Sequence, residues 1–352
     1  MAPPAAPFSV LDATFSALAS VRAELRDVGV RLTMWANPAI TRATFGERVS
    51  ANWPLLAFDE MVMWCLLYAA IATYGVFARS AYFAARRDGK GAAAEPKAAA
   101  AAKKGDAAPA APWSWSATSA KLARDPLKAL MVLYNLVQVV VCSAMCVDVL
   151  LVVLAPGYYP ESPLSPFCTG ARWRREHDSR VARVHWVFYV SKLLDFMDTV
   201  FIIARNKWEQ FIPLHIYHHL SVFPVQWLIQ TAAPDGDTWW PVFANAFVHV
   251  VMYAYYGLSA LDLKPTWGKY LTMLQITQFL SMIAHSSFLA INQPAPHTLL
   301  PAGLLPFTCA FPFWTAVVYG SYVFSLLVLF LAFFNRKHGG KGAKAAAADK
   351  AE

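Results

Sequence analysis

The sequence is poor in charge for a chain of its length. Charged residues make up 15% of the 352 residues, whereas hydrophobic residues make up 57%. Soluble proteins carry about 25% charged residues. This shortage of charge excludes a string of ordinary soluble domains, and long apolar runs take the place of the missing polar surface.

Other absences narrow the functional classes further. The five cysteines form no metal-binding pattern, and we expect Cys142 and Cys146, which share a helical face, to be packing residues. No internal repeat is visible, and residues 1–35 lack the apolar core of a cleavable signal peptide. The net charge of +8 does not indicate a nucleic-acid partner, because the basic residues lie where membrane topology places them.

Seven apolar runs are each long enough to cross a bilayer, which takes about 20 residues. We therefore expect an all-α, polytopic membrane domain at residues 55–335 with seven transmembrane helices. The runs cover 59–82, 127–154, 184–204, 211–232, 239–261, 269–291 and 312–334.

The charge distribution predicts the topology. Segment 79–128 holds ten lysines and arginines against four acids, which places it in the cytoplasm by the positive-inside rule. The N-terminus is then lumenal and the C-terminus cytoplasmic. One loop, 169–183, is rich in arginine and yet falls on the lumenal side of this scheme.

Three segments are predicted to lack structure, because Ala-, Pro- and Lys-rich sequence buries too little apolar surface to offset the entropy of ordering. The first is residues 1–14, within a lumenal N-terminal segment of residues 1–54. The others are an Ala-rich cytoplasmic linker within 88–120 and a cytoplasmic tail at 336–352.

The densest polar group inside a predicted span is HIYHH, residues 215–219. On a helix His215, His218 and His219 project from one face. Ionisable residues inside a bilayer are costly and by default functional. A buried hydrogen-bonding cluster is the alternative, but three imidazoles on one face favour function.

A second polar face lies in NAFVHVVMYAYY, residues 245–256. Asn245, His249, Tyr253 and Tyr256 recur there at helical spacing. This face is either part of an active site or a polar seam between helices.

A third polar face lies in SKLLDFMDTVFIIARNK, residues 191–207. Lys192, Asp195, Asp198 and Thr199 either contact substrate or fix the helix register through a buried ion pair.

A fourth face, in TMLQITQFLSMIAH at 272–285, carries two amides and a histidine. Gln275 and Gln278 either contact substrate or join helices by hydrogen bonds. We expect no catalytic role for His285, a lone histidine near the lumenal end.

Three basic residues end predicted spans on the cytoplasmic side, where they either anchor the protein or bind phosphates. They are Arg205, Lys207 and Lys269.

Metal chemistry is the first alternative to consider. HxxHH resembles one box of the membrane di-iron desaturases, which need about eight histidines in three boxes. Six of the nine histidines lie outside the motif here and form no second box. Adjacent His218 and His219 point in different directions, so a three-histidine zinc site on one helix would be strained.

Nucleophilic chemistry fits these residues better. A neutral imidazole attacks a thioester to give an acyl-imidazole, or acts as a general base. An apolar interior with several imidazoles, next to a basic cytoplasmic rim, suits an acyl thioester with a phosphate-rich head group.

Four segments in this order resemble the ELO family of very-long-chain fatty acid elongases. They are KLLDFMDTVFIIARNK (192–207), HIYHH (215–219), NAFVHVVMYAYY (245–256) and TMLQITQF (272–279). The sequence departs from many relatives at Asp195, where they have glutamate, and at Asn206, where they have a basic residue. The DFMDT segment is similar to that of some algal elongases of polyunsaturated chains.

The resemblance implies a reaction and its location. An acyl-CoA condenses with malonyl-CoA to give CO2, CoA and a 3-oxoacyl-CoA two carbons longer, with no metal or organic cofactor, in the endoplasmic reticulum membrane. Six of the helices would enclose the acyl channel. The elongation-cycle ketoacyl reductase, dehydratase and enoyl reductase are the expected partners, and a homodimer is compatible with the family.

The resemblance also ranks the histidines. His218 is the expected nucleophile, and His249, positioned by Asn245, is its partner in proton transfer or decarboxylation. His215 and His219 would orient this pair and stabilise negative charge. The alternatives are a metal-dependent lipid oxidase or hydroxylase and a non-enzymatic seven-helix receptor or transporter.

One covalent feature follows from the predicted topology. Cys168 and Cys309 both fall on the lumenal side, where disulfides persist, so we expect them to pair.

Overall fold

The computed structural model describes residues 8–48, 50–87, 113–155, 167–170, 180–263, 265–293 and 309–348, and every regular element in these ranges is helical. The helices are α1 (Phe8–Ala36), α2 (Phe58–Arg87), α3 (Trp115–Arg124), α4 (Pro126–Val153), α5 (Arg180–Leu194), α6 (Phe196–Ala204), α7 (Pro213–Ala232), α8 (Trp239–Ala260), α9 (Gly268–Ile291) and α10 (Phe313–Ala348).

Five of the predicted spans are helices long and apolar enough to cross a membrane. They are Phe58–Arg87, Pro126–Val153, Gly236–Ala260, Tyr270–Ile291 and Phe313–Asn335. The predicted span 211–232 corresponds to α7, which carries the three histidines of the HIYHH motif. The structure therefore supports a polytopic membrane protein with five such helices among the described residues.

The predicted span 184–204 is not one continuous helix. It is divided at Asp195 into α5 and α6, and the Asp198 N–H donates to the Asp195 carbonyl at 3.1 Å across the junction. Aspartate is a weak helix former, so little intrinsic preference opposes a turn here. The prediction of an uninterrupted helix was wrong because it used apolar length alone.

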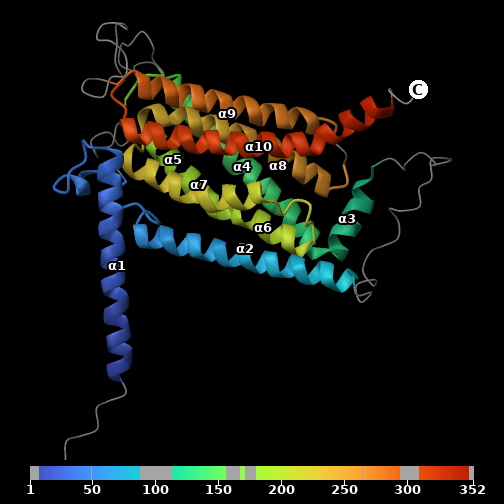
Figure 1. Ribbon diagram of the computed structural model, residues 1–352, viewed down its shortest axis with the longest axis horizontal. Coiled ribbons are helices and arrows are strands. Elements are labelled where there is room, and N and C mark those ends of the chain that lie inside the picture. The colour runs from blue at the N-terminus through green and yellow to red at the C-terminus, as the bar shows by residue number, and fades with distance from the viewer. Residues whose placement is uncertain are drawn as a thin grey trace, which may run out of the picture.

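The helices α2 and α4 to α10 run side by side along the long axis of the molecule (Figure 1). α4 packs chiefly against α8, and α9 against α10, while α7 contacts α2, α5 and α10. Aromatic side chains hold α7 in this central position. Phe223 and Trp227 of α7 pack with Tyr68 of α2 and Tyr189 of α5. The histidine motif thus lies on a helix that is enclosed by its neighbours.

Two segments predicted to be unstructured are helical. α1 begins at Phe8, within residues 1–14, and α10 continues through the predicted tail to Ala348. Alanine is the strongest helix former, and a tail that extends an existing helix needs no new nucleation. In the Ala-rich linker, α3 begins at Trp115, and residues 88–112 lie outside the described residues.

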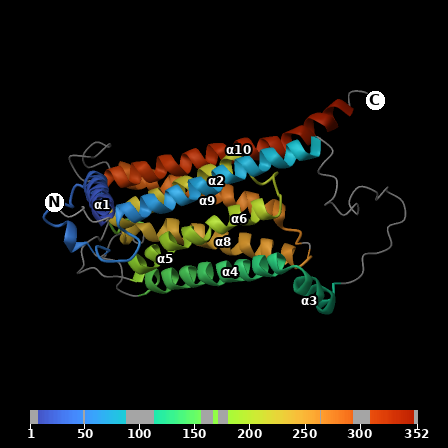
Figure 2. The same ribbon diagram turned by 90° about the horizontal axis from the view of Figure 1, so that it is seen from below.

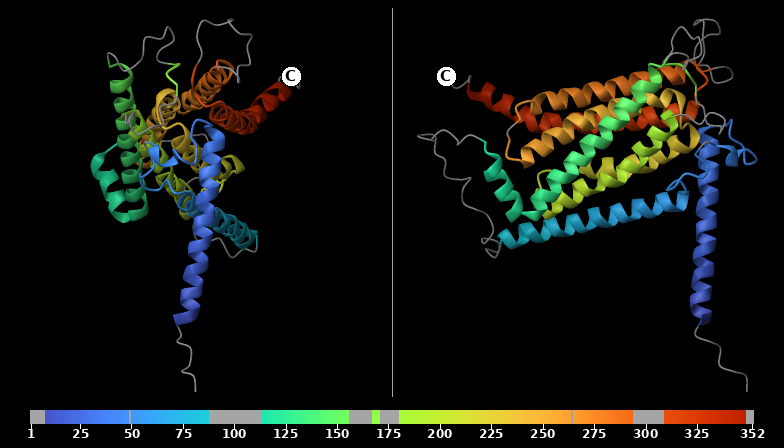
Figure 3. Two further views of the ribbon diagram at one scale, coloured as in Figure 1. Left: turned by 90° about the vertical axis from the view of Figure 1, so that its left-hand side faces the viewer. Right: turned by 180° about the vertical axis from the view of Figure 1, so that it is seen from behind.

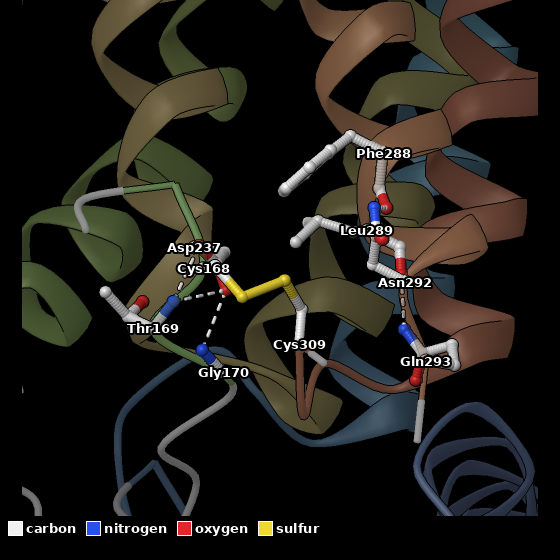
Figure 4. Close-up of a disulfide and its surroundings, with 9 residues drawn as sticks. All are labelled: Cys168, Thr169, Gly170, Asp237, Phe288, Leu289, Asn292, Gln293 and Cys309. Atoms are coloured by element: carbon white, nitrogen blue, oxygen red, sulfur yellow. Dashed lines mark hydrogen bonds between the residues drawn. A yellow bond between two sulfur atoms is a disulfide. The ribbon is translucent and has the colours of Figure 1, made fainter. Parts of the chain in front are cut away.

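The structure joins Cys168 to Cys309 by a disulfide at one end of the bundle, with Cα atoms 5.2 Å apart (Figure 4). The Asp237 carboxylate beside it accepts the Thr169 N–H at 3.1 Å and the Gly170 N–H at 2.8 Å. Gly236 is required there, since it has φ +75° and an added Cβ would lie 1.7 Å from the Gly170 oxygen. The loop before α5 is therefore fixed to the segments that begin α8 and α10.

We expect loss of this disulfide to destabilise the fold. Cys168→Ser combined with Cys309→Ser removes a crosslink between residues separated by 141 positions, which should cost about 2–5 kcal/mol. Thermal unfolding in detergent should show a lower Tm, whereas Cys65→Ser, at a free and half-buried cysteine, should leave the Tm nearly unchanged. Equal Tm values for the three proteins would contradict a stabilising crosslink.

Candidate functional site

The HIYHH motif occupies the first two turns of α7. Pro213 at the helix start is suited to this position because its missing N–H would have no partner there. The rings of His215 and His219 lie 4.3 Å apart between centroids, and those of His218 and His219 lie 5.2 Å apart. The three imidazoles therefore form one cluster, as their spacing predicts.

Two of these imidazoles differ in their hydrogen bonding. His215 Nε2 lies 2.8 Å from Thr199 Oγ1, and this hydroxyl lies 3.2 Å from the Tyr68 hydroxyl of α2. His219 is buried, and its Nδ1 has no partner among the described residues. His215 is thus held in place, while His219 presents a buried polar atom that is open to a ligand.

A buried lysine links α5 to α8. Lys192 Nζ donates to Asp195 Oδ2 at 3.2 Å and to Asn245 Oδ1 at 3.3 Å. The side chains of Lys192 and Asp195 are each only 2% exposed. The predicted third and second polar faces therefore meet at this lysine.

The two carboxylates of the DFMDT segment share one tyrosine. The Tyr253 hydroxyl of α8 lies 3.2 Å from Asp195 Oδ1 and 2.8 Å from Asp198 Oδ2. The ring of His249 lies 5.5 Å from that of Tyr253, one turn along the same helix. His249 is thereby placed beside the Lys192–Asp195 pair.

The proposed catalytic histidines come from different helices and lie within electrostatic range of the same charged pair. His218 of α7 and His249 of α8 are each close enough to Lys192 and Asp195 to sense their charges, and His249 is also within this range of His218. His249 is buried, and His218 is half-buried. The fold thus brings together the imidazoles of two polar faces that are about thirty positions apart in the sequence.

The sequence did not single out two residues of α4 that complete this network. Gln138 Nε2 donates to Asp195 Oδ1 at 2.7 Å and to the Tyr134 hydroxyl at 3.0 Å. The Tyr134 hydroxyl in turn lies 3.4 Å from that of Tyr253. The sequence pattern that could have identified these two residues is a tyrosine and an amide at positions i and i+4, on one helix face of a strongly apolar span.

Two of the predicted substrate-binding residues lie elsewhere, and a third lies at the edge of the network. Gln278 of α9 is buried and donates to Met282 Sδ in its own helix, and Gln275 is half-buried on the same helix. The described contacts of these two amides do not join them to the network around Lys192. Tyr256 of α8 is 45% exposed, and its ring lies 6.3 Å from that of Tyr253 between centroids.

The helix cap at the end of α6 fixes the backbone at Arg205 and Lys207, two residues of the predicted basic rim. Asn206 has φ +52°, and the N–H groups of Asn206 and Lys207 donate to the carbonyls of Ile203 and Ile202. This is a Schellman cap, and asparagine tolerates the left-handed conformation that such a cap requires. The departure from a basic residue at Asn206 therefore has a conformational reason.

The rim residues differ in how free they are to bind a ligand. Arg205 pairs with Asp125 at 2.9 Å, and this hydrogen-bonded guanidinium lowers the pKa of the Asp125 carboxyl. The Lys207 side chain is exposed. The side chain of Lys269 lies outside the described residues.

Substitution of Lys207 is therefore the most direct test of whether this rim binds phosphate groups. Lys207→Gln should raise the KM for a substrate with a phosphate-rich head group up to about tenfold, the equivalent of one charge-assisted hydrogen bond, with kcat unchanged. Lys121→Gln is the matched control, because Lys121 lies in the same region and pairs with Asp262 at 2.9 Å. Steady-state kinetics that give both variants the wild-type KM would leave Lys207 only a membrane-anchoring role.

A small cavity of about 20 Å³ lies toward the opposite end of the bundle, and this volume holds about one water molecule. The His285 Nε2 and the Tyr319 hydroxyl have no hydrogen-bond partner among the described residues. Gln226 lies eight residues beyond His218 on α7, which is about 12 Å along the helix. The surface of the cavity is apolar, although several of the residues around it carry polar groups, among them His185, Gln226, Thr238, His285, Thr315 and Tyr319.

In the part of the chain that the structure describes, no three His, Cys, Asp or Glu side chains are grouped so that they could hold a metal ion. His215 Nε2 contacts Thr199, and the ring of His219 lies beside those of His215 and His218.

Comparisons with known proteins agree with the four sequence segments. The model of the GNS1/SUR4 family, ELO, matches residues 110–346, which include α3 to α9 and most of α10. Very long chain fatty acid elongase 2 of Mus musculus is 34% identical over 221 residues, covering 62% of this chain and 68% of the relative. Very long chain fatty acid elongase 5 of Homo sapiens is 36% identical over 180 residues, covering 50% of this chain and 55% of the relative.

Proposed function

This chain belongs to the GNS1/SUR4 (ELO) family and is a condensing enzyme of fatty acid elongation, and from this premise we propose how its residues carry out the reaction. An acyl-CoA and malonyl-CoA are its substrates, and a 3-oxoacyl-CoA is its product. The single observation that carries the proposal is that His218 and His249, on different helices, both lie within electrostatic range of the buried Lys192–Asp195 pair.

We propose that α7 and the divided element α5–α6 cross the membrane together with the five long apolar helices. Both elements are packed inside the bundle of long apolar helices, where α7 contacts α2, α5 and α10. Seven crossings would put the C-terminal end of α10 and the flanks of the basic loop, Arg87 and Trp113, on one side. We assign that side to the cytoplasm of the endoplasmic reticulum, with the disulfide in the lumen.

In the first half of the reaction, a His218 nitrogen attacks the thioester carbonyl of acyl-CoA. A carbon–nitrogen bond forms, the carbon–sulfur bond breaks, and CoA leaves with the imidazole proton. Negative charge develops on the carbonyl oxygen during this step. His219, with its unpartnered Nδ1, and Lys192 are the groups of this cluster suited to stabilise that charge.

In the second half, malonyl-CoA occupies the position that CoA has left. Its carbon–carboxylate bond breaks to release CO2, and the electron pair stays on the carbon next to the thioester. This carbon attacks the acyl-imidazole carbonyl, the carbon–nitrogen bond breaks, and His218 takes up a proton. His249 passes this proton to His218 and takes one up from water, which is the proton that the overall reaction consumes. Asn245, held by Lys192, orients His249.

The apolar chain of the acyl group would lie along the bundle interior, between α7 and α8. From His218 this path leads toward the small cavity near His185 and His285. Enclosure of the chain by the six helical elements after α2 is part of the proposal, and it follows the pattern that the family resemblance implies.

We propose polyunsaturated acyl-CoA as the preferred substrate, because the DFMDT segment is similar to that of algal elongases for such chains. A host that expresses the protein should be supplied with a panel of saturated and polyunsaturated fatty acids. Elongation of saturated chains alone would reverse this assignment. The reductases and dehydratase of the elongation cycle are the proposed partners, since they consume a 3-oxoacyl-CoA.

The decisive experiment is malonyl-CoA-dependent elongation by the purified protein. Radiolabelled malonyl-CoA and an acyl-CoA should yield labelled 3-oxoacyl-CoA and release CO2 in equal amounts. The condensation should proceed without added metal and persist after treatment with a chelator. Loss of the reaction on chelation, restored by a metal, would favour the metal-dependent alternative, and absence of any condensation would favour a receptor or transporter.

A further inference from the structure

α1 lies crosswise to the membrane helices rather than among them. Figure 1 and the right-hand view of Figure 3 show it crossing the disulfide-bearing end of the bundle and extending past α2. Figure 2, viewed nearly along the α1 axis, shows α2 and α10 both running away from it to the same side. A helix in this position is level with the membrane surface at that end.

Contacts with the first turns of two membrane helices fix the orientation of α1. Gly29 lies so close to Phe58 of α2 that an added Cβ would approach the Phe58 Cβ to 2.5 Å. Arg22 and Arg26 pair with Asp59 of α2 at 2.7 and 2.8 Å. The ring of Trp35 stacks on that of Trp314 in α10, with centroids 5.5 Å apart. The sides of α1 that bear these residues therefore face the membrane domain.

An apolar stripe runs along α1 between these two contacts. Its six residues recur at spacings of three and four, so they share one face of the helix, and they are Leu18, Val21, Leu25, Val28, Leu32 and Trp35. Leu18 is 55% exposed and Val21 is 52% exposed, and no described helix covers them. A neighbouring face, about a quarter turn round the helix, is polar and carries Ser16, Ser20, Glu24, Asp27 and Arg31.

From this arrangement we propose that α1 is an interfacial helix whose apolar stripe inserts into the surface of the lipid leaflet at the disulfide-bearing end. Helices that lie in the plane of a bilayer bury such a face about 5–10 Å into the headgroup and acyl boundary. The stripe is continuous with the lipid-facing surface of the membrane domain through Trp35 and Trp314, and tryptophans are enriched at that depth.

Apolar insertion, rather than charge, drives this binding. Residues 16–36 carry three arginines against two acids, and Arg22 and Arg26 are already engaged by Asp59. The occupant of the stripe is therefore a lipid surface in general, with no requirement for anionic headgroups. α1 lies outside the matched family region, so this membrane contact adds to the elongase domain.

The test compares neighbouring positions on the two faces of α1. The full-length protein, with Cys65, Cys142 and Cys146 changed to alanine, is reconstituted into phosphatidylcholine nanodiscs. Single spin labels are attached after Leu18→Cys or Val21→Cys on the stripe, and after Ser20→Cys or Glu24→Cys on the polar face as matched controls. Collision rates are measured with oxygen, which concentrates in lipid, and with a water-soluble nickel chelate.

We expect the labels at 18 and 21 to shift toward oxygen and those at 20 and 24 toward the nickel chelate. All four labels are on exposed or polar positions, and retained elongation activity shows that each variant is folded. Equal exposure of the four labels to the nickel chelate would overturn the proposal. Spin–spin broadening at 18 and 21 that disappears on dilution with unlabelled protein would also overturn it, because a second copy would then cover the stripe.

Discussion

Replacing His218 with alanine is expected to lower turnover by at least roughly 10³-fold, which is the scale seen when a nucleophile is removed from an enzyme that keeps its binding groups. The structure supports a large effect, since His218 is half-buried and lies within electrostatic range of both His249 and the Lys192–Asp195 pair. Wild-type protein incubated with acyl-CoA alone should release free CoA and gain one acyl mass within peptide 215–219.

Two variants separate this role from structural ones. His249→Ala should still form the adduct and then fail to condense it, because its proposed role comes in the second half of the reaction. His285→Ala should keep most of the activity, since His285 lines the cavity at the other end of the bundle. An intact protein without adduct, together with near-normal turnover of His218→Ala, would replace covalent catalysis by a direct base-catalysed condensation.

Lys192→Met is expected to damage both stability and activity. It leaves the buried Asp195 carboxylate without its cation, and loss of one partner of a buried ion pair costs about 3–5 kcal/mol. It also removes the hydrogen bond that Lys192 donates to Asn245. Thermal unfolding and elongation assays on the same preparation should therefore both decline, with the Tm falling by several degrees.

A double variant distinguishes the two effects. Lys192→Met with Asp195→Asn removes both charges, so much of the lost stability should return, because no uncompensated charge is then buried. Activity should stay low, since Asn245 and the histidines still lack the lysine. Recovery of activity along with stability would show that the pair only fixes the packing of α5 against α8.

Much of this site could be predicted because polar side chains inside apolar runs have a clear cost. His215, His218 and His219 stand out for this reason, and helical spacing alone places them on one face. The meeting of Lys192 with Asn245 could not be predicted from spacing, since it joins positions 53 apart in the sequence. Only the family resemblance linked the faces before the fold was known.

The features that sequence reasoning missed depend on tertiary contacts. Gln138 is one of two amides in a very apolar span, and its importance arises from Asp195, 57 positions away. The turn at Asp195 has a similar origin, because its carboxylate accepts from α4, α5 and α8 side chains. The helical α1 was missed because its Ala- and Pro-containing start was weighed by composition rather than by the periodic stripe that follows.

The distribution of these polar groups also bears on how the protein is made. Among the described helices, five are apolar enough to enter a bilayer one by one as they leave the ribosome, whereas α5–α6 and α7 carry a lysine, two arginines, two aspartates and four histidines. Buried charges of this kind penalise insertion of an isolated segment. The hydrogen bond from Lys192 to Asn245 can form only after α8 has been synthesised. The polar elements would therefore wait beside α4 at the translocon, and the catalytic centre would be assembled late in biosynthesis.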